Sequence, residues 1–276
     1  MELMLYHEEF MMKAPVNKII PFSNVDGPGN RLSVFFQGCL FRCWYCHNPE
    51  TIHQVDKCAI CLENKRIKEE GLDISLLKEC KALRGSNANW MSVEDVMEHI
   101  KEVEPYIRGI TVSGGECMLH ADFLLELARE IKTTTNLTFL IDSCGYIDFK
   151  DHQELLEYCD GVMLDVKAWN PEFHKKLTGQ SNDNVINNLK YLLEMNKLHE
   201  VRTVVLPRYE EFNEETIINV SKIIKDKTDY KLLKYRQYGV RDIGIEKIGR
   251  SSPTEDLMNS YIKLANSHGA TSTYFI

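Results

Sequence analysis

LTFLIDSCGYIDFKDHQELLEYCDGVMLDVK, residues 137–167, places one amphipathic segment between two short apolar runs. The runs LTFLIDS (137–143) and GVMLDVK (161–167) have the length and the apolar character of buried parallel strands. The segment DHQELLEYC between them has the apolar spacing of a helix. A strand, a helix and a second strand predict one β/α unit of a parallel sheet.

The same alternation continues on both sides of this stretch. Six β/α units result, and they predict an α/β fold, a partial (β/α)6 TIM-like barrel, because a complete barrel needs eight units. A flat doubly wound sheet is the alternative architecture. The other runs are RLSVFFQ (31–37), IRGITVS (107–113), EVRTVVLP (200–207) and YKLLKY (230–235), and the helical segments are ADFLLELAREIKT, NVINNLKYLLEMN and ETIINVSKIIK.

Two segments lie outside this regular pattern. Residues 50–90 are rich in lysine and glutamate and have weak periodicity, so we expect an insertion within a single domain spanning residues 1–276. The helix MSVEDVMEHIKEV (91–103) follows it. At the other end, a last helix is expected to be capped by Ser252 with Pro253 in its first turn, followed by a strand TSTYF.

Composition narrows the class of protein. The chain has 276 residues and a net charge of −8, which argues against a general role in binding nucleic acid. It has no apolar run long enough for a membrane span and no secretory signal pattern at its start, so we expect a cytoplasmic protein without a membrane partner. The chain has nine cysteines and no secretory signal pattern, which favours a reducing compartment. The odd number of cysteines also argues against a disulfide framework.

Three of the cysteines lie close together in GCLFRCWYCHN, residues 38–48. Cys39, Cys43 and Cys46 have the spacing C-x3-C-x2-C, whereas a structural zinc site commonly takes four ligands in two C-x2-C pairs. Plant-type electron-transfer clusters also use four thiolates, with a different spacing. Three ligands in one loop indicate a metal centre with an open coordination position, where a substrate or a cofactor can bind.

Polar residues follow the predicted strands at their carboxyl ends, which is the edge where parallel α/β folds bind ligands. SGGE (113–116) offers glycines that let backbone groups approach a ligand closely. A lysine and an arginine on this edge would bind a carboxylate, and backbone carbonyls would bind an amine, so the edge favours a zwitterionic ligand. The other residues on it are Asp142, Ser143, Asp165, Lys167 and Arg202.

The motifs resemble those of a known family. CLFRCWYCHN resembles the cluster loop of radical S-adenosylmethionine (SAM) enzymes. VDGPGNRLSVFFQGC resembles the activating enzymes of glycyl radical enzymes, among them pyruvate formate-lyase activase. The likeness continues through ITVSGGE, LIDSCG and VMLDVKAWN, and it is nearest to the YjjW-type activases.

The resemblance implies a [4Fe–4S] cluster whose three protein ligands are Cys39, Cys43 and Cys46, with SAM on the fourth iron. One electron, from a flavodoxin or a ferredoxin, would cleave SAM into methionine and a 5′-deoxyadenosyl radical. This radical would abstract a hydrogen from a backbone glycine of a partner glycyl radical enzyme. The cofactor would perform the chemistry, and the protein would position it and exclude water.

The resemblance also assigns contacts in the site. Asp26 would face the incoming glycine loop, and Lys167 with Arg202 would meet the carboxylate of SAM. Arg236 stands in a segment where the family commonly has histidine, and it could contact the adenosine or the carboxylate. The other cofactor contacts would come from Tyr45, Cys46, His47, Gly115, Asp165 and Val166.

Two further metal sites are considered. By resemblance to pyruvate formate-lyase activase, a monovalent cation, Na⁺ or K⁺, would be bound by Asp142, Ser143, Met163 and Asp165. Related activases carry eight cysteines for two extra clusters in the insertion. The cysteines of this insertion are Cys58, Cys61 and Cys80, which could hold one cluster, or one zinc ion with His53, or no metal.

Three functions fit these observations. The first is the activase reaction on a protein glycine. The second keeps the same radical chemistry but acts on a small molecule or a peptide. The third is a non-catalytic iron–sulfur or zinc protein that serves as a carrier or scaffold, and it does not need the polar edge formed by GGE and DVK.

Overall fold

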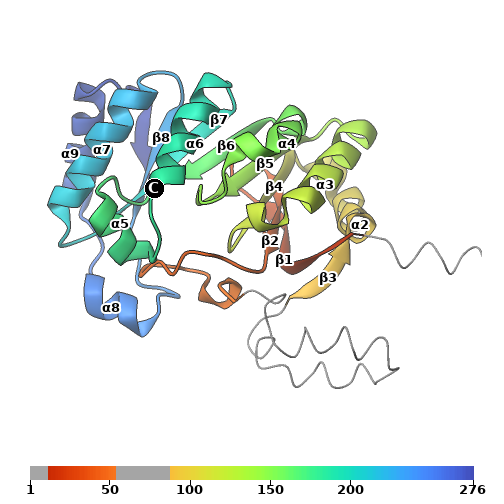
Figure 1. The fold of residues 1–276 in the computed structure, drawn as a ribbon, viewed down its shortest axis with the longest axis horizontal. Coiled ribbons are helices and arrows are strands. Elements are labelled where there is room, and N and C mark those ends of the chain that lie inside the picture. Colours follow the sequence, from red (N-terminus) through yellow and green to blue (C-terminus); the bar gives the residue numbers. More distant parts are fainter. Residues whose placement is uncertain (1–11, 54–87) are drawn as a thin grey trace, which may run out of the picture.

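The computed structural model describes residues 12–53 and 88–276, which form one sheet and the helices that pack on it (Figure 1). The predicted insertion cysteines Cys58, Cys61 and Cys80 lie outside the described residues. The strands are β1 (Lys13–Ser23), β2 (Arg31–Phe36), β3 (Asn89–Ser92), β4 (Gly109–Gly114), β5 (Thr138–Ser143), β6 (Gly161–Asp165), β7 (Leu198–Val205), β8 (Asp229–Lys234) and β9 (Thr273–Phe275).

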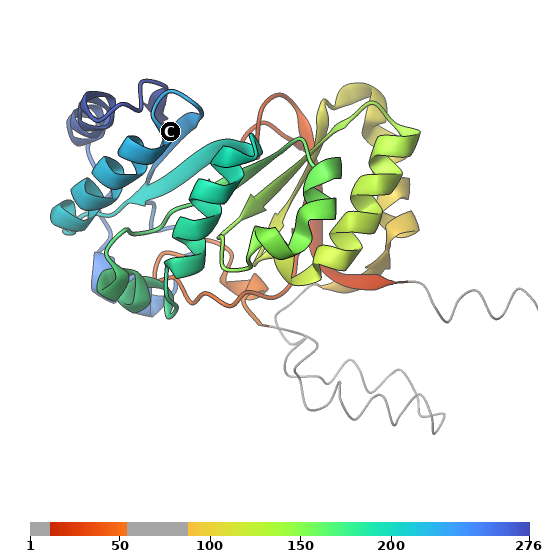
Figure 2. The ribbon, with the colours of Figure 1, turned by 45° about the horizontal axis from the view of Figure 1, so that its top comes forward.

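The helices connect successive strands of this sheet. α3, α4, α6 and α7 lie side by side along one of its faces (Figures 1 and 2). None of the helices in the described ranges is both long enough and apolar enough to span a membrane. The helices are α2 (Val93–Val103), α3 (Ala121–Thr134), α4 (Gln153–Tyr158), α5 (Pro171–Thr178), α6 (Asp183–Glu194), α7 (Glu210–Ile224), α8 (Asp242–Ile248) and α9 (Glu255–Ser267).

The sheet has the strand order β3-β1-β2-β4-β5-β6-β7-β8-β9. From β2 onward, each strand pairs in parallel with the next one along the described chain, apart from β3, which pairs antiparallel with β1 at the edge. A doubly wound sheet would reverse its strand order at a switch point, and this sheet does not. The predicted partial barrel is therefore confirmed, and its two edge strands, β3 and β9, leave it open.

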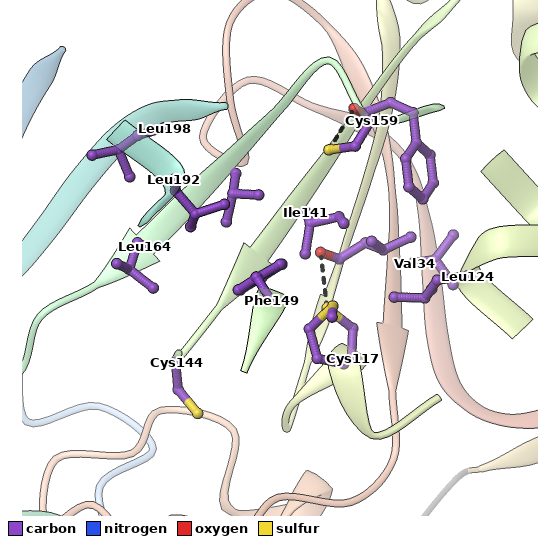
Figure 3. Close-up of a cluster of buried hydrophobic side chains, with 14 of the residues drawn as sticks. Val34, Cys117, Leu124, Ile141, Cys144, Phe149, Cys159, Leu164, Leu192 and Leu198 are labelled. Carbon is purple, nitrogen blue, oxygen red and sulfur yellow. Dashed lines mark hydrogen bonds between the residues drawn. The ribbon is translucent and has the colours of Figure 1, made fainter. Parts of the chain in front are cut away.

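The core lies between the strands and the helices (Figure 3). All six residues of β2 are buried, as expected for a strand covered on both faces. Val34 from β2, Ile141 from β5 and Leu164 from β6 join Leu124 and Phe149 in one apolar cluster. This packing holds the carboxyl ends of the strands at one edge, where the predicted site residues lie.

The structure corrects some predicted boundaries. Met91 and Ser92 belong to strand β3 and not to the helix, and Ser92 caps α2 by accepting a hydrogen bond from the Asp95 amide. The predicted cap of the last helix at Ser252 is wrong, because Thr254 caps α9 and accepts a hydrogen bond from the Leu257 amide. Proline at position 253 thus precedes the helix and does not lie in its first turn.

Candidate functional site

The three clustered cysteines line one cavity of about 300 Å³ at the carboxyl end of the barrel. Cys39 and Cys43 are buried, and Cys46 is partly exposed. Their loop follows β2 and is anchored through its backbone, since the Gly38 amide donates to the Thr51 carbonyl at 2.7 Å. The loop is therefore fixed at its start, and the predicted neighbourhood of the three thiols is found in the structure.

The three sulfurs have different surroundings. Cys39 Sγ accepts a hydrogen bond from the Phe41 amide at 3.3 Å, and its interaction with the Cys144 side chain is the main cause that lowers its pKa. Burial raises the pKa of Cys46, and a hydrogen bond with the Asn48 backbone, which stabilises the thiolate, opposes this rise. Burial also raises the pKa of Cys43 to about 12, although the nearby positive charge of Lys167 opposes this. Bound iron would replace the protons of all three thiols.

The three thiols line one cavity but are not gathered around a single point. Within residues 12–53 and 88–276, no three histidine, cysteine or acidic side chains are gathered closely enough to hold one metal ion. A four-iron cluster does not require this, because each cysteine binds a different iron. The buried Tyr45 hydroxyl, on the same cavity, has no hydrogen-bond partner among the described residues, as expected for a group that awaits a ligand.

The glycines after β4 pack against the cysteine loop. Gly114 has a φ of +120°, which favours glycine, and a Cβ at Gly115 would lie 2.1 Å from the Gly38 carbonyl oxygen. The next amide, that of Glu116, donates to the same oxygen at 2.7 Å. The close backbone approach found here is to the cysteine loop, and the predicted approach to a ligand stays a prediction.

The carboxylate of Glu116 holds the end of β5 in place, a role that the sequence did not reveal. It is 1% exposed, and its Oε2 accepts a hydrogen bond of 2.7 Å from the Cys144 amide. Its Oε1 accepts from the Ser143 hydroxyl at 2.8 Å and from the Met118 amide at 3.1 Å. Burial raises the pKa of Glu116, and the hydrogen bonds that it accepts oppose this rise.

Two cations lie on the same edge, as the sequence predicts. Lys167 Nζ lies 2.7 Å from Asp165 Oδ2 and 5.7 Å from the ring centre of Tyr45. Arg202 Nη1 lies 3.1 Å from Asp142 Oδ2. Burial is the main cause that raises the pKa of Asp142, to about 6, and the positive charge of Arg202 opposes it. Both cations are thus held by carboxylates at the cavity wall.

Further contacts hold Arg202 from the other side. Its Nε lies 2.5 Å from Glu200 Oε1, and Lys231 lies 3.0 Å from Glu200 Oε2. Arg202 Nη2 also donates to Met163 Sδ at 2.9 Å. The guanidinium therefore lies between Glu200, which sequence reasoning missed, and two members of the predicted cation site, Asp142 and Met163. Side chains two residues apart on a strand point to the same face of the sheet, so the spacing of Glu200 and Arg202 on β7 could have indicated this pair.

Asp26 reaches the same cavity from the loop between β1 and β2. Its Oδ2 accepts hydrogen bonds from Ser23, at 2.6 Å, and from Ser33, at 2.8 Å. The buried Arg31 supports this loop, because its Nε donates to Thr111 Oγ1, and that hydroxyl donates to the backbone carbonyl of Asp26 at 2.5 Å. Asp26 is therefore placed in the barrel by several contacts.

The other predicted residues fall in two groups. His47, which is exposed, lines the cavity, and its Nε2 lies 2.9 Å from the Arg236 carbonyl oxygen. Arg236 itself has an exposed side chain and is not among the residues that line the cavity. Val166 and Met163 are buried beside the cavity and are not among its lining residues. Cys43, Cys46, Gly115, Asp142, Ser143, Asp165, Lys167 and Arg202 all line it.

Known proteins are similar to this chain. The model of the radical SAM superfamily matches residues 33–220. The pyruvate formate-lyase-activating enzyme of Streptococcus mutans is 33% identical over 276 residues, covering 94% of this chain and 92% of the relative. A Haemophilus influenzae protein, provisionally named a glycyl-radical enzyme activating enzyme, is 30% identical over 252 residues, covering 83% of this chain and 84% of the relative.

The fold is also similar to solved structures. The structure of QueE from Escherichia coli matches with a TM-score of 0.55 and 15% identity. The match covers 99% of this chain and 97% of the QueE chain. This likeness concerns the fold alone. The family match, the two relatives and the three-cysteine cavity together lead to one conclusion. The chain belongs to the radical SAM superfamily, and it is a radical SAM oxidoreductase whose relatives are named as activating enzymes of glycyl radical enzymes.

Proposed function

We propose that this protein activates a glycyl radical enzyme by forming a radical on a backbone glycine of that partner. The observation that carries the proposal is one cavity that Cys39, Cys43, Cys46, Asp26 and the Lys167–Arg202 cations line together. The relatives with activase names support it. When bound, the [4Fe–4S] cluster and SAM would supply an electron and a 5′-deoxyadenosyl radical that takes one hydrogen atom from the glycine.

The residues of the chain would bind, orient and shield. Cys39, Cys43 and Cys46 would hold three irons, and the loop contacts would fix their positions. Lys167 and Arg202 would bind the SAM carboxylate, because both are cations at the cavity wall. Tyr45, His47 and Gly115 would contact the rest of SAM, together with Asp165 and Val166. The buried apolar wall near Phe41 would limit access of water.

Asp26 would orient the incoming glycine loop of the partner. Its carboxylate is held by two serine hydroxyls, which leaves further lone pairs for backbone amides of the partner. The cavity joins Asp26 to the cysteine loop, as a shared substrate site requires. Glycine suits this reaction, since it has no side chain to hinder approach to its Cα.

An external flavodoxin or ferredoxin is the proposed electron donor. Three insertion cysteines are too few for two additional clusters, so the electron would reach the catalytic cluster directly. The exposed His47 and the partly exposed Cys46 mark the part of the cysteine loop that such a donor could approach.

A monovalent cation, Na⁺ or K⁺, is also proposed at Asp142, Ser143, Met163 and Asp165. It would compete with the guanidinium of Arg202 for Asp142 and Met163. Arg202 would then be free to turn to the SAM carboxylate. The expected result is tighter SAM binding in K⁺ or Na⁺ than in a bulky organic cation of equal ionic strength.

The test of the main proposal uses protein reconstituted with iron and sulfide under anaerobic conditions. With SAM and dithionite, wild type is expected to form 5′-deoxyadenosine, and Cys43→Ala is expected to form none. Cys159→Ala is a matched control, because that thiol is buried away from the cavity. Electron paramagnetic resonance with purified glycyl radical enzymes would then detect the glycyl radical. Failure of the loaded protein to bind SAM would exclude the activase function.

A further inference from the structure

The segment between β8 and α9, residues 236–248, packs closely against the cysteine loop. It contains α8, which lies near α5 at one end of the molecule (Figure 1). The Arg236 carbonyl oxygen lies 2.9 Å from His47 Nε2. A Cβ on Gly244 would lie 1.9 Å from the Trp44 carbonyl oxygen, so the two backbones approach each other at a distance that only glycine permits.

One arginine of this segment binds the backbone of the cysteine loop. Arg241 Nη2 donates hydrogen bonds to the Arg42 carbonyl oxygen, at 2.9 Å, and to the Cys43 carbonyl oxygen, at 3.0 Å. These two carbonyls belong to the peptide groups on either side of the Cys43 Cα. The guanidinium therefore fixes the backbone from which the side chain of this cysteine extends.

Helix α5 binds the same stretch of the loop through different atoms. The Arg42 amide donates to the Thr178 carbonyl at 2.7 Å, and the Trp44 amide donates to the Leu177 carbonyl at 3.0 Å. Both acceptors lie in the last turn of α5, where carbonyls have no partner within the helix. The amides of this stretch are thus bound by α5, and its carbonyls are bound by the arginine.

The positive charge of Arg241 is not neutralised by a carboxylate. Among the residues that the structure describes, no acidic side chain forms a salt bridge with it, and its buried Nε has no hydrogen-bond partner. A partly buried cation without a counter-charge is costly in free energy. The three thiolates that bind a cluster would supply negative charge nearby, so the arginine fits a loop that holds a cluster.

We propose that Arg241 is a positioning residue that holds Cys43 in place for the [4Fe–4S] cluster by binding the carbonyls on both sides of it. The inference rests on the proposed function in one respect, that the three cysteines hold a cluster. Loss of a group that orients the ligand of a metal centre typically costs about 10-fold to 100-fold in metal affinity. A cluster with only three protein ligands has no fourth thiolate to retain it when one ligand is displaced.

The experiment measures iron retention by the reconstituted protein under anaerobic conditions, without SAM or a partner. Arg241→Gln is expected to lose half of its iron at an EDTA concentration about 10-fold lower than wild type does. Arg241→Lys keeps a cationic donor that can reach one of the two carbonyls, so its iron loss should lie between the two. The electron paramagnetic resonance spectrum of the reduced cluster should also change in Arg241→Gln, because Cys43 would bind its iron in a different geometry.

Lys197→Gln is the matched control, because Lys197 Nζ donates to the carbonyl of another cysteine, Cys159, at 2.7 Å and away from the cavity. It is expected to retain iron as wild type does. Gly244→Ala is a second variant that leaves the arginine in the sequence. Its new Cβ would push the segment away from Trp44, so it is expected to lose iron more readily than wild type.

A merely structural role of Arg241 would lower the stability of the cluster-free protein and leave the spectrum of the reduced cluster unchanged. An unchanged spectrum in Arg241→Gln would therefore overturn the inference. Wild-type iron retention in Arg241→Gln and Gly244→Ala would also overturn it, as would an equal loss of iron in Lys197→Gln. Failure of the activase function would appear in the SAM assay instead, since the EDTA titration requires the cluster alone.

Discussion

The guanidinium of Arg202 lies 3.1 Å from the carboxylate of Asp142 and 2.5 Å from that of Glu200. The two carboxylates lie on different strands, β5 and β7, so the arginine links them across β6. Its side chain is largely buried, which strengthens each interaction relative to one at the surface. These contacts orient the cation that is proposed to bind SAM, and they make it a sensitive position for substitution.

Arg202→Lys is expected to weaken SAM binding by about 10-fold to 100-fold, because lysine cannot reproduce a planar fork of donors. Equilibrium binding to the cluster-loaded protein would measure this under anaerobic conditions. Lys231→Gln is the matched control, since Lys231 pairs with the other oxygen of Glu200 but does not line the cavity. An equal loss in both variants would show that the Glu200 network, and not direct contact with SAM, governs affinity.

Asp142 is expected to make stability depend on pH. Its pKa is raised from 3.8 to about 6 in the folded protein, so between these values the folded state binds more protons at this group than the unfolded state. The contribution of Asp142 to the free energy of unfolding therefore decreases as pH rises from about 4 to 6. Asp142→Asn should remove this decrease. Urea unfolding of cluster-free wild type and variant across this range would test it, and parallel pH profiles would contradict it.

Gly115→Ala is expected to reduce the iron content after reconstitution. The new Cβ would lie 2.1 Å from the Gly38 carbonyl oxygen, so the cysteine loop must shift. The free energy of unfolding should fall by about 1–3 kcal/mol, as for other overpacked sites. Gly269→Ala is the control for iron content, because its φ of +107° also strains the added Cβ, whereas the nearest atom, Lys225 Cγ, lies 3.5 Å away and outside the cavity. Normal iron content in Gly115→Ala would refute the proposed packing role.

Arg31→Met is expected to lower the free energy of unfolding by about 3 kcal/mol. The buried carbonyls that accept hydrogen bonds from Arg31 would lose a charged donor in this variant. Its Nη2 donates to the Ile110 carbonyl at 2.7 Å and to the Thr138 carbonyl at 3.2 Å. Arg129→Met should change stability little, since the Arg129–Glu154 pair is exposed. Calorimetry or denaturant unfolding of both variants would compare them, and equal stabilities would contradict the expectation.

The sequence predicted the repeating part of the fold because its strands are short apolar runs. Strand β1 has no such signal, since KAPVNKIIPFS contains two prolines and its pairing with β2 and β3 is antiparallel. The pairing of Lys13 with Ser92, which lies 79 residues later in the sequence, cannot be inferred from local periodicity. The edge of the sheet therefore emerges only from the tertiary structure.

Helix α5 was missed although its signals were present. Asn170 caps it, Pro171 opens it, and Gly179 ends it in a left-handed conformation. Of these residues, only Asn170 belongs to a motif used in the sequence analysis, as the last residue of VMLDVKAWN. By contrast, the role of Glu116 had no local signal, because its partners, Ser143 and Cys144, come from the next strand along the sheet.

The cysteine spacing and the polar strand ends predicted which residues line the cavity, because parallel strands bring their carboxyl ends to one edge. Arg236 was predicted to contact the cofactor because of its place in a motif. Its side chain is exposed, so position in the chain alone does not fix the direction in which a side chain points. Cys144 lines the same cavity as Cys39, although it lies 105 residues later in the chain, which spacing cannot reveal.

Within the described residues, the sheet ends at β3 and β9, which has a topological consequence for the proposed reaction. A glycine in the middle of a folded polypeptide has no free end to thread through a closed ring of strands. A sheet that stops short of a ring offers a lateral slot, through which a hairpin of backbone can enter and leave sideways. In the proposed reaction, the open sheet would thus make an internal glycine of the partner accessible, and the visiting chain would supply the absent wall while the reaction lasts.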